Sequence, residues 1–113
     1  MRILGVDPGL TTGLSLIYDG RIMWESETKS LSFLWGLLDT MVPNVIVAES
    51  LIGNPTIDIS YPLKAIGVCQ LYAELNFIPM VYSNPSILQG KKKPRGLSPH
   101  IWSARVHALN YKE

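Results

Sequence analysis

A chain of 113 residues in which 47% of the residues are hydrophobic and 17% are charged has the length and composition of a folded globular protein. We therefore expect residues 1–113 to form one domain with one hydrophobic core. No apolar run is long enough to span a membrane, and the apolar run before Asp7 is too short for a signal peptide. Because Cys69 is the only cysteine, an internal disulfide is excluded and a reducing cytoplasm is the expected location.

The net charge of +1 conceals an uneven distribution along the chain. Residues 1–90 contain four Lys or Arg and eight acidic residues, whereas residues 91–113 contain six Lys or Arg and one acidic residue. A basic end on a mildly acidic body indicates a polyanionic partner that is held at one place. A solvated loop and a charged C-terminus would explain the charges equally well.

The first half of the chain predicts three short strands, a helix and a further strand. The strands cover residues 2–6, 13–18 and 21–26, the helix covers residues 30–42 and the last strand covers residues 44–48. Asp19-Gly20 is a hairpin turn signal between the second and third strands. Ser30 is a suitable N-cap for the helix, and Pro43 ends it. The last strand is rich in β-branched residues, which is typical of a central strand covered on both faces.

The second half predicts a helix, a strand and a final helix, separated by loops. The loops cover residues 50–57 and 84–97, the helices cover residues 58–76 and 98–113, and the strand covers residues 79–83. Ser98-Pro99 begins the final helix, with serine as the N-cap and proline in the first turn. The core candidates of the earlier helix are Leu63, Ile66, Leu71 and Leu75.

Three consecutive strands followed by alternating helices and strands predict an α/β protein with a mixed sheet. We expect a five-stranded sheet, three strands antiparallel and then two parallel, flanked by about three helices.

Two carboxylates, Asp7 and Glu49, each stand directly after an apolar strand. One such carboxylate is ordinarily solvated or caps a turn, but two would meet at one sheet edge if their strands are parallel neighbours. Carboxylates about 4 Å apart in a partly buried site repel each other unless they share a proton or a cation. Hard oxygen ligands select Mg²⁺ or Mn²⁺, and the chemistry that follows is metal-assisted hydrolysis of a phosphodiester.

The final helix carries His100, Ser103 and His107 at i, i+3 and i+7, which places them on one face. A histidine on a helix face is commonly a structural or surface residue, and this interpretation suits His107, which lies within an apolar pattern. His100 is in the first turn, beside the expected carboxylate pair, and is the better candidate for a metal ligand.

Four segments carry a resemblance to a known family. Gly5-Val6-Asp7-Pro8-Gly9-Leu10, followed by Thr11-Thr12-Gly13, looks like the first-strand motif of the RuvC-type Holliday-junction resolvases. Val45-Ile46-Val47-Ala48-Glu49 resembles their fourth strand with its catalytic glutamate. Residues 64–70 resemble their central helix, and residues 98–104 resemble the helix start that brings the remaining metal ligands. The resemblance extends over nearly the whole chain.

The resemblance implies an RNase H-like fold and Mg²⁺-dependent cleavage of branched DNA, such as four-way junctions, flaps or forks, by a homodimer. Mn²⁺ is expected to substitute for Mg²⁺. By position, Asp7, Glu49 and His100 would be metal ligands, and Ser103 would complete the catalytic set. The short chain is similar to small phage-encoded members, which implies the cytoplasm of a bacterial cell or a phage-infected host.

Ser103 is the main departure from the family pattern, because many members have an aspartate at this position. A neutral hydroxyl does not supply the charge of a carboxylate. Four interpretations stay open: a weak nuclease, a one-metal site, a protein that binds without cutting, and a chain altered to prevent cleavage.

A lysine-rich loop precedes the final helix and is compact where other members have a longer segment. Contacts from this loop to DNA phosphates would position DNA without reading its sequence and would make binding strongly salt-dependent. Core packing suits Trp102 better than stacking on unpaired bases. Asn54 and Pro55 lie where the family inserts into a junction. The predicted phosphate contacts are Lys91, Lys92, Lys93 and Arg95.

The leading hypothesis is a metal-dependent, structure-selective endonuclease that resolves Holliday junctions or related branched DNA. The alternative is a catalytically weak or inactive protein that keeps the nuclease fold and binds branched DNA. A nucleotide-binding fragment of the actin-like ATPase type would also explain Asp7-Pro8-Gly9, but the chain lacks the second phosphate loop of such proteins.

Overall fold

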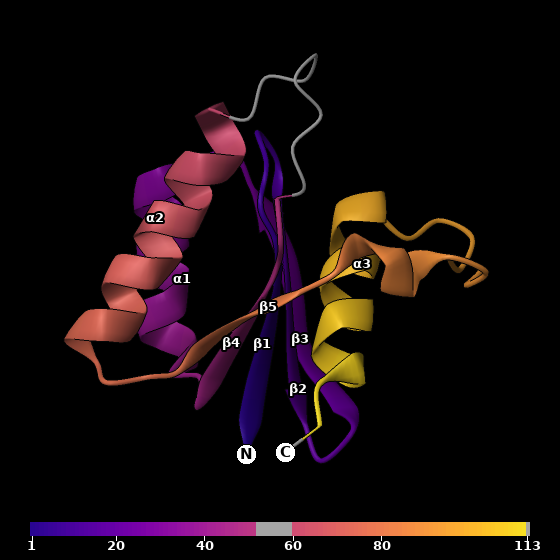
Figure 1. Cartoon of the computed structure of the whole chain (residues 1–113), viewed down its shortest axis with the longest axis horizontal. Coiled ribbons are helices and arrows are strands. Elements are labelled where there is room, and N and C mark those ends of the chain that lie inside the picture. Colours follow the sequence, from indigo (N-terminus) through magenta and orange to yellow (C-terminus); the bar gives the residue numbers. More distant parts are fainter. Residues whose placement is uncertain (52–59, 113) are drawn as a thin grey trace.

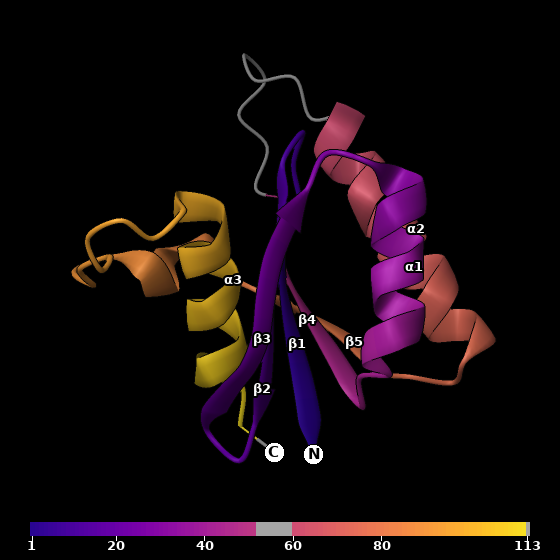
Figure 2. The ribbon, with the colours of Figure 1, turned by 180° about the vertical axis from the view of Figure 1, so that it is seen from behind.

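A central sheet separates two helices on one face from a single helix on the other (Figure 1). This computed structural model describes residues 1–51 and 60–112. Figure 2 shows the same three layers from behind. None of the helices in the described ranges is long and apolar enough to cross a membrane. The elements are β1 (Arg2–Asp7), β2 (Thr12–Tyr18), β3 (Arg21–Thr28), α1 (Leu31–Met41), β4 (Val45–Glu49), α2 (Ser60–Leu75), β5 (Met80–Ser83), a 3-10 turn (Pro85–Leu88) and α3 (Pro99–Asn110).

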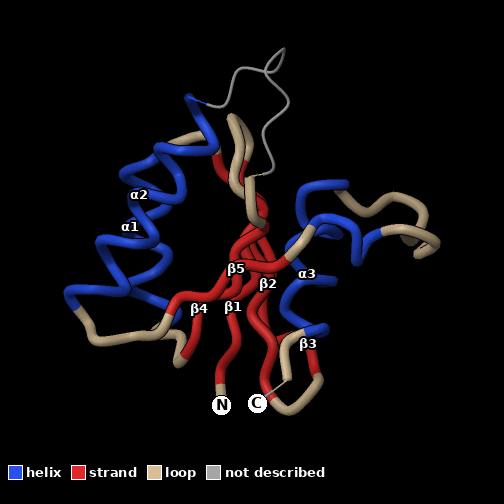
Figure 3. The backbone as a smooth tube through the Cα atoms, in the orientation of Figure 1, coloured by secondary structure: helices blue, strands red, loops and turns tan. Residues whose placement is uncertain are grey.

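The strand order across the sheet is β3-β2-β1-β4-β5. Figure 3 shows the strands in red between the blue helices. β1 pairs antiparallel with β2, and β2 pairs antiparallel with β3. β4 is parallel to both β1 and β5. The predicted α/β class, the five-stranded mixed sheet and the three flanking helices are therefore confirmed.

Capping residues define the ends of several elements. Ser30 caps α1 by accepting a hydrogen bond from the backbone N–H of Phe33 at 3.2 Å, as predicted. The prediction of an unbroken loop over residues 84–97 is wrong at its start, because Asn84 caps a 3-10 turn by accepting from Ser86 N–H. The final helix ends at Asn110, before the predicted end.

Alternation along each strand decides which side chains meet which helix layer. On β1, Leu4 and Val6 are buried in the core beneath α1 and α2, whereas Ile3 belongs to the smaller cluster with Ala108 of α3. Asp7 is an even number of positions from Ile3 on β1, so it lies on the same face of the sheet as Ile3. The face that carries Ile3 and Asp7 is therefore the face that α3 covers.

The core side of α2 differs from the prediction. Leu63, Leu71 and Leu75 are 51%, 52% and 61% exposed. The buried positions are instead small or aromatic, namely Ala65, Cys69, Tyr72 and Ala73. The prediction failed because apolar residues occur all round this helix, so periodicity alone does not select its buried face.

Two glycines allow α3 to lie unusually close to the sheet. A Cβ on Gly5 of β1 would overlap the backbone carbonyl of Ala104, and a Cβ on Gly13 of β2 would overlap the backbone carbonyl of His100. Any other residue at either strand position would push α3 outward. The functional side chains of α3 depend on this close approach.

Candidate metal and nucleic-acid site

The two strand-end carboxylates lie at one edge of the sheet. β1 and β4 are adjacent and parallel, with Val6 paired with Ala48, so Asp7 and Glu49 follow the same rung of the ladder. Both side chains are largely buried, with 19% and 22% of their surface exposed. Parallel pairing thus brings together two acids that are 42 positions apart in the sequence.

The two carboxylates have opposite electrostatic environments. Burial, and then the charge of Glu49, raise the pKa of Asp7 from 3.8 to about 7. The hydrogen bond from His107 lowers the pKa of Glu49 below its ordinary value, and Ser103 adds to this effect against the opposing effect of burial. Near neutral pH, Glu49 is therefore ionised while Asp7 resists losing its proton unless a positive charge is supplied.

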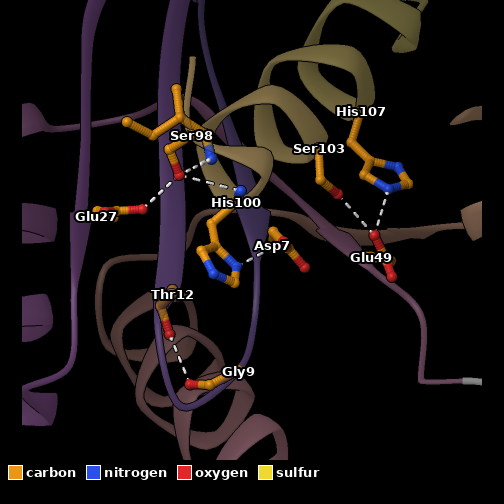
Figure 4. A network of polar contacts seen from close by, with 10 residues as sticks. Asp7, Gly9, Thr12, Glu27, Glu49, Ser98, His100, Ser103 and His107 are labelled. Carbon is orange, nitrogen blue, oxygen red and sulfur yellow. Dashed lines mark hydrogen bonds and ion pairs between the residues drawn. The ribbon is translucent and has the colours of Figure 1, made fainter. Parts of the chain in front are cut away.

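His100 lies beside Asp7 at the N-terminus of α3 (Figure 4). Its Nδ1 is 3.7 Å from Oδ2 of Asp7, and 43% of its side chain is exposed. Ser98 caps the helix by accepting hydrogen bonds from the backbone N–H groups of His100 and Ile101. The Ser98 hydroxyl in turn donates to Oε2 of Glu27 on β3 at 2.5 Å, which ties the start of α3 to the sheet.

Ser103 and His107 both contact Glu49 from α3. The Ser103 hydroxyl donates to Oε2 of Glu49 at 2.8 Å, and Nε2 of His107 lies 3.0 Å from the same oxygen. His107 is completely buried, in keeping with its apolar sequence surroundings. It is nevertheless part of the carboxylate site, a contact that the sequence interpretation missed.

The donor set decides what the site can hold. Within the described ranges, no group of three or more His, Cys, Asp or Glu side chains is arranged to hold a metal ion. Mg²⁺, however, is commonly bound through one or two carboxylates and completes its shell with waters and phosphates. Asp7 and Glu49 fit this mode, because a cation held by them would offset the burial and the charge of Glu49 that together raise the pKa of Asp7.

The basic loop that precedes α3 is exposed, but one of its lysines, Lys93, makes hydrogen bonds within the loop. Lys91, Lys92 and Arg95 extend from an exposed stretch of chain. Lys93 instead donates from Nζ to the backbone carbonyl of Leu97 at 2.6 Å, and more weakly to that of Pro94. Lys93 therefore braces its own loop, which leaves three strong candidates for phosphate contacts.

Arg105 and Trp102 of α3 make contacts within the fold, and two further residues predicted to contact DNA lie outside the described ranges. Arg105 forms a two-point ion pair with Glu25 of β3, at 2.8 and 2.6 Å. Trp102 is partly buried beneath the Arg105 guanidinium, 6.0 Å from the ring centroid. The predicted junction-inserting residues Asn54 and Pro55 lie outside the residues that the structure describes.

Glu25 and Glu27 were also missed as residues that hold α3 in place. Glu25 and Glu27 are two positions apart on β3, so the alternation of side chains along a strand places both on one face of the sheet. In the structure, β3 pairs Glu25 with Ser15 and Glu27 with Gly13. Both acids therefore lie on the sheet face of Asp7 and Glu49. The strand pattern alone does not reveal that a helix covers this face.

These features define an α/β protein with the RNase H-like fold and a carboxylate pair at the ends of two central strands. Among solved structures with this fold is RuvC of Thermus thermophilus in complex with a Holliday-junction substrate, with a TM-score of 0.77, 18% identity, and coverage of 96% of this chain and 91% of that chain. A second Thermus thermophilus RuvC structure has a TM-score of 0.73 at 18% identity and covers 96% and 92% of the two chains. No family model and no curated protein matches the sequence.

Proposed function

We propose that this protein is a metal-dependent endonuclease of the Holliday-junction resolvase type, which cleaves branched DNA. The observation that carries the proposal is the meeting of Asp7 and Glu49 at one sheet edge, against a helix start that carries His100. The likeness in fold to a RuvC that is solved with a Holliday-junction substrate supports the same function. The compact basic loop suits a phage-type member that acts in the cytoplasm.

Asp7 and Glu49 would hold Mg²⁺, with Mn²⁺ as a substitute, and His100 would complete the protein's share of the site. When bound, the ion supplies activation of water and stabilisation of the leaving oxygen in phosphodiester hydrolysis. Asp7 would lose its proton as the ion binds. Glu49 is kept ionised by its hydrogen bonds from α3, so the site needs to release only one proton to accept the cation.

DNA would lie across the start of α3. The exposed side chains of Lys91, Lys92 and Arg95 are in the segment that leads directly into Ser98 and His100. Contacts from these cations to phosphates on either side of a scissile bond would position the backbone without reading bases. Lys93 would act indirectly, by holding the loop in shape.

A homodimer would cut both strands of a junction. The exposed stripe of Leu63, Gly67, Leu71 and Leu75 along α2 supports this partner, since these residues recur every four positions and so share one side of the helix. α2 is on the sheet face opposite α3 (Figure 1), so pairing through it would leave both active sites open.

A second function is favoured by Ser103. It is buried and commits its hydroxyl to Glu49, and it contributes no negative charge to a second metal. A protein that binds branched DNA with little or no cleavage would keep every other feature of the site. The two functions share substrate and fold and differ only in turnover.

The proposal is tested by incubating purified protein with labelled four-way junctions and flaps in Mg²⁺ or Mn²⁺. We expect cleavage that is lost in Asp7→Asn and Glu49→Gln while junction binding is retained. Arg21→Ala, at the hairpin far from the site, is the matched control and should cut normally. Binding without cutting by the unaltered protein in either metal would replace the nuclease with the binding function, and an absence of binding would overturn both.

A further inference from the structure

One oxygen of Glu49 is held by two donors from the same helix. Ser103 and His107 are four positions apart on α3, so they lie one turn apart on one side of the helix. Both approach Oε2 of Glu49, at 2.8 and 3.0 Å. No hydrogen bond or ion pair reaches Oε1 from the rest of the described residues. Figure 4 shows the two side chains converging on this carboxylate from one side.

The geometry requires a particular protonation of the His107 ring. An ionised carboxylate only accepts hydrogen bonds, so Nε2 of His107 must carry the hydrogen in this pair. Nδ1 is buried and has no hydrogen-bond partner among the described residues. A ring that served only to fill the core would be replaced at less cost by an apolar residue of similar size, because a buried polar atom without a partner is unfavourable.

We infer that His107 is a positioning residue, which acts with Ser103 to lock Oε2 of Glu49 so that Oε1 is the oxygen offered to the cation. The inference rests on the proposed metal-dependent function and extends it to a residue outside the expected ligand set. Ser103 makes a single uncharged hydrogen bond to the carboxylate of Glu49. His107 supplies a second hydrogen bond to the same oxygen, and the two together fix the orientation of the carboxylate. His107 itself does not touch the cation, since it is completely buried and its Nε2 is directed at Glu49.

The first test is a matched set of variants in which the metal, not the reaction, is measured. His107→Gln places an amide N–H₂ near the position of Nε2, whereas the shorter side chain of His107→Asn does not reach Glu49. We expect Mn²⁺ affinity, measured by titration calorimetry, to fall about 10- to 100-fold in His107→Asn and to stay within about threefold of the original in His107→Gln. Circular dichroism in EDTA checks that each variant is folded.

Equal Mn²⁺ affinity in all three folded proteins would overturn the inference and leave the proposed function intact. An absence of Mn²⁺ binding by the unaltered protein would overturn the proposed function and, with it, this role of His107. The two failures are thus distinguishable.

The second test needs no variant and no metal. Long-range ¹H–¹⁵N correlation spectra of the histidine rings report which ring nitrogen carries hydrogen in the metal-free protein. We expect a hydrogen on Nε2 of His107 and a signal that shifts when Ser103 is replaced by alanine, because the two donors share one oxygen. A neutral ring with its hydrogen on Nδ1 would overturn the inference even if the variants proved unstable.

Discussion

The Cα of Gly5 lies against the backbone carbonyl of Ala104, in a space that does not admit a methyl group. This contact sets the distance between β1 and α3. The hydrogen bonds from Ser103 and His107 to Glu49 span the same two layers, so they depend on it. A strand glycine therefore controls the geometry of a site in which it has no chemical part.

Gly5→Ala should destabilise the protein by about 1–3 kcal/mol, because the new methyl group meets backbone that has no rotamer with which to move aside. Gly36→Ala in α1 is the matched control. Its added Cβ meets no atom within 4 Å, and alanine in a helix interior should stabilise by about 0.5–1 kcal/mol. Urea unfolding followed by circular dichroism measures both. Equal stability of the two variants would contradict the close packing of α3.

Asp7→Asn should stabilise the metal-free protein at pH 8 and have little effect at pH 3.5. The pKa of Asp7 is raised from 3.8 to about 7, so the folded state holds this proton more tightly than the unfolded state does. The contribution of Asp7 to stability therefore falls as pH rises from about 4 to about 7, by at most about 4 kcal/mol. Unfolding in EDTA across this range checks the difference between the variant and the original. Asp39→Asn, on the exposed side of α1, is the control for the loss of one carboxylate.

Replacing Lys91 and Lys92 by alanine should weaken junction binding and make it less dependent on salt. Each phosphate contact that is lost should reduce the slope of log affinity against log salt by about 0.9. Titrations at several salt concentrations measure the slope, with Arg21→Ala, which removes one positive charge at the far end of the sheet, as a control. An unchanged slope would show that the loop is not part of the DNA-binding surface.

Lys93→Ala should act differently, because it removes the hydrogen bond to the backbone carbonyl of Leu97 and should loosen the loop.

Leu71→Glu should dissociate the proposed homodimer, because it places charge in the middle of the exposed α2 stripe. Leu109→Glu puts the same charge on a leucine of α3 that is 49% exposed and should leave the assembly unchanged. Sedimentation equilibrium distinguishes dimer from monomer. A monomeric original protein at high concentration, without DNA, would refute dimerisation through α2.

Ser103→Asp should destabilise the protein in EDTA by about 1–3 kcal/mol, since a second carboxylate would replace the hydroxyl that donates to Glu49. Ser103→Asn, which adds similar bulk without charge, is the control. Addition of Mn²⁺ should recover the loss in the aspartate variant only. Junction cleavage should not increase in this variant if serine belongs to a working site. A tenfold or larger gain in cleavage would favour the binding protein as the natural function.

The sequence by itself determined the order of elements and the two strand-end acids. Local signals suffice for these, because turns such as Asp19-Gly20, with positive φ at both residues, and caps such as Ser30 and Ser98 depend on neighbouring residues alone. Asp7 and Glu49 were predicted to meet if their strands were parallel neighbours, and the structure shows that β1 and β4 are such a pair.

Only the tertiary structure decided which face of α2 is buried and which α3 side chains reach the acids. The bond from His107 to Glu49 links residues 58 positions apart, and that from Arg105 to Glu25 links residues 80 apart. Such bonds depend on the distance between helix and sheet, which Gly5 and Gly13 set by omitting a side chain. Local sequence carries no record of that distance. This is why Asp7 and Glu49 were predicted to mark the site, whereas the bond from His107 that orients Glu49 was not.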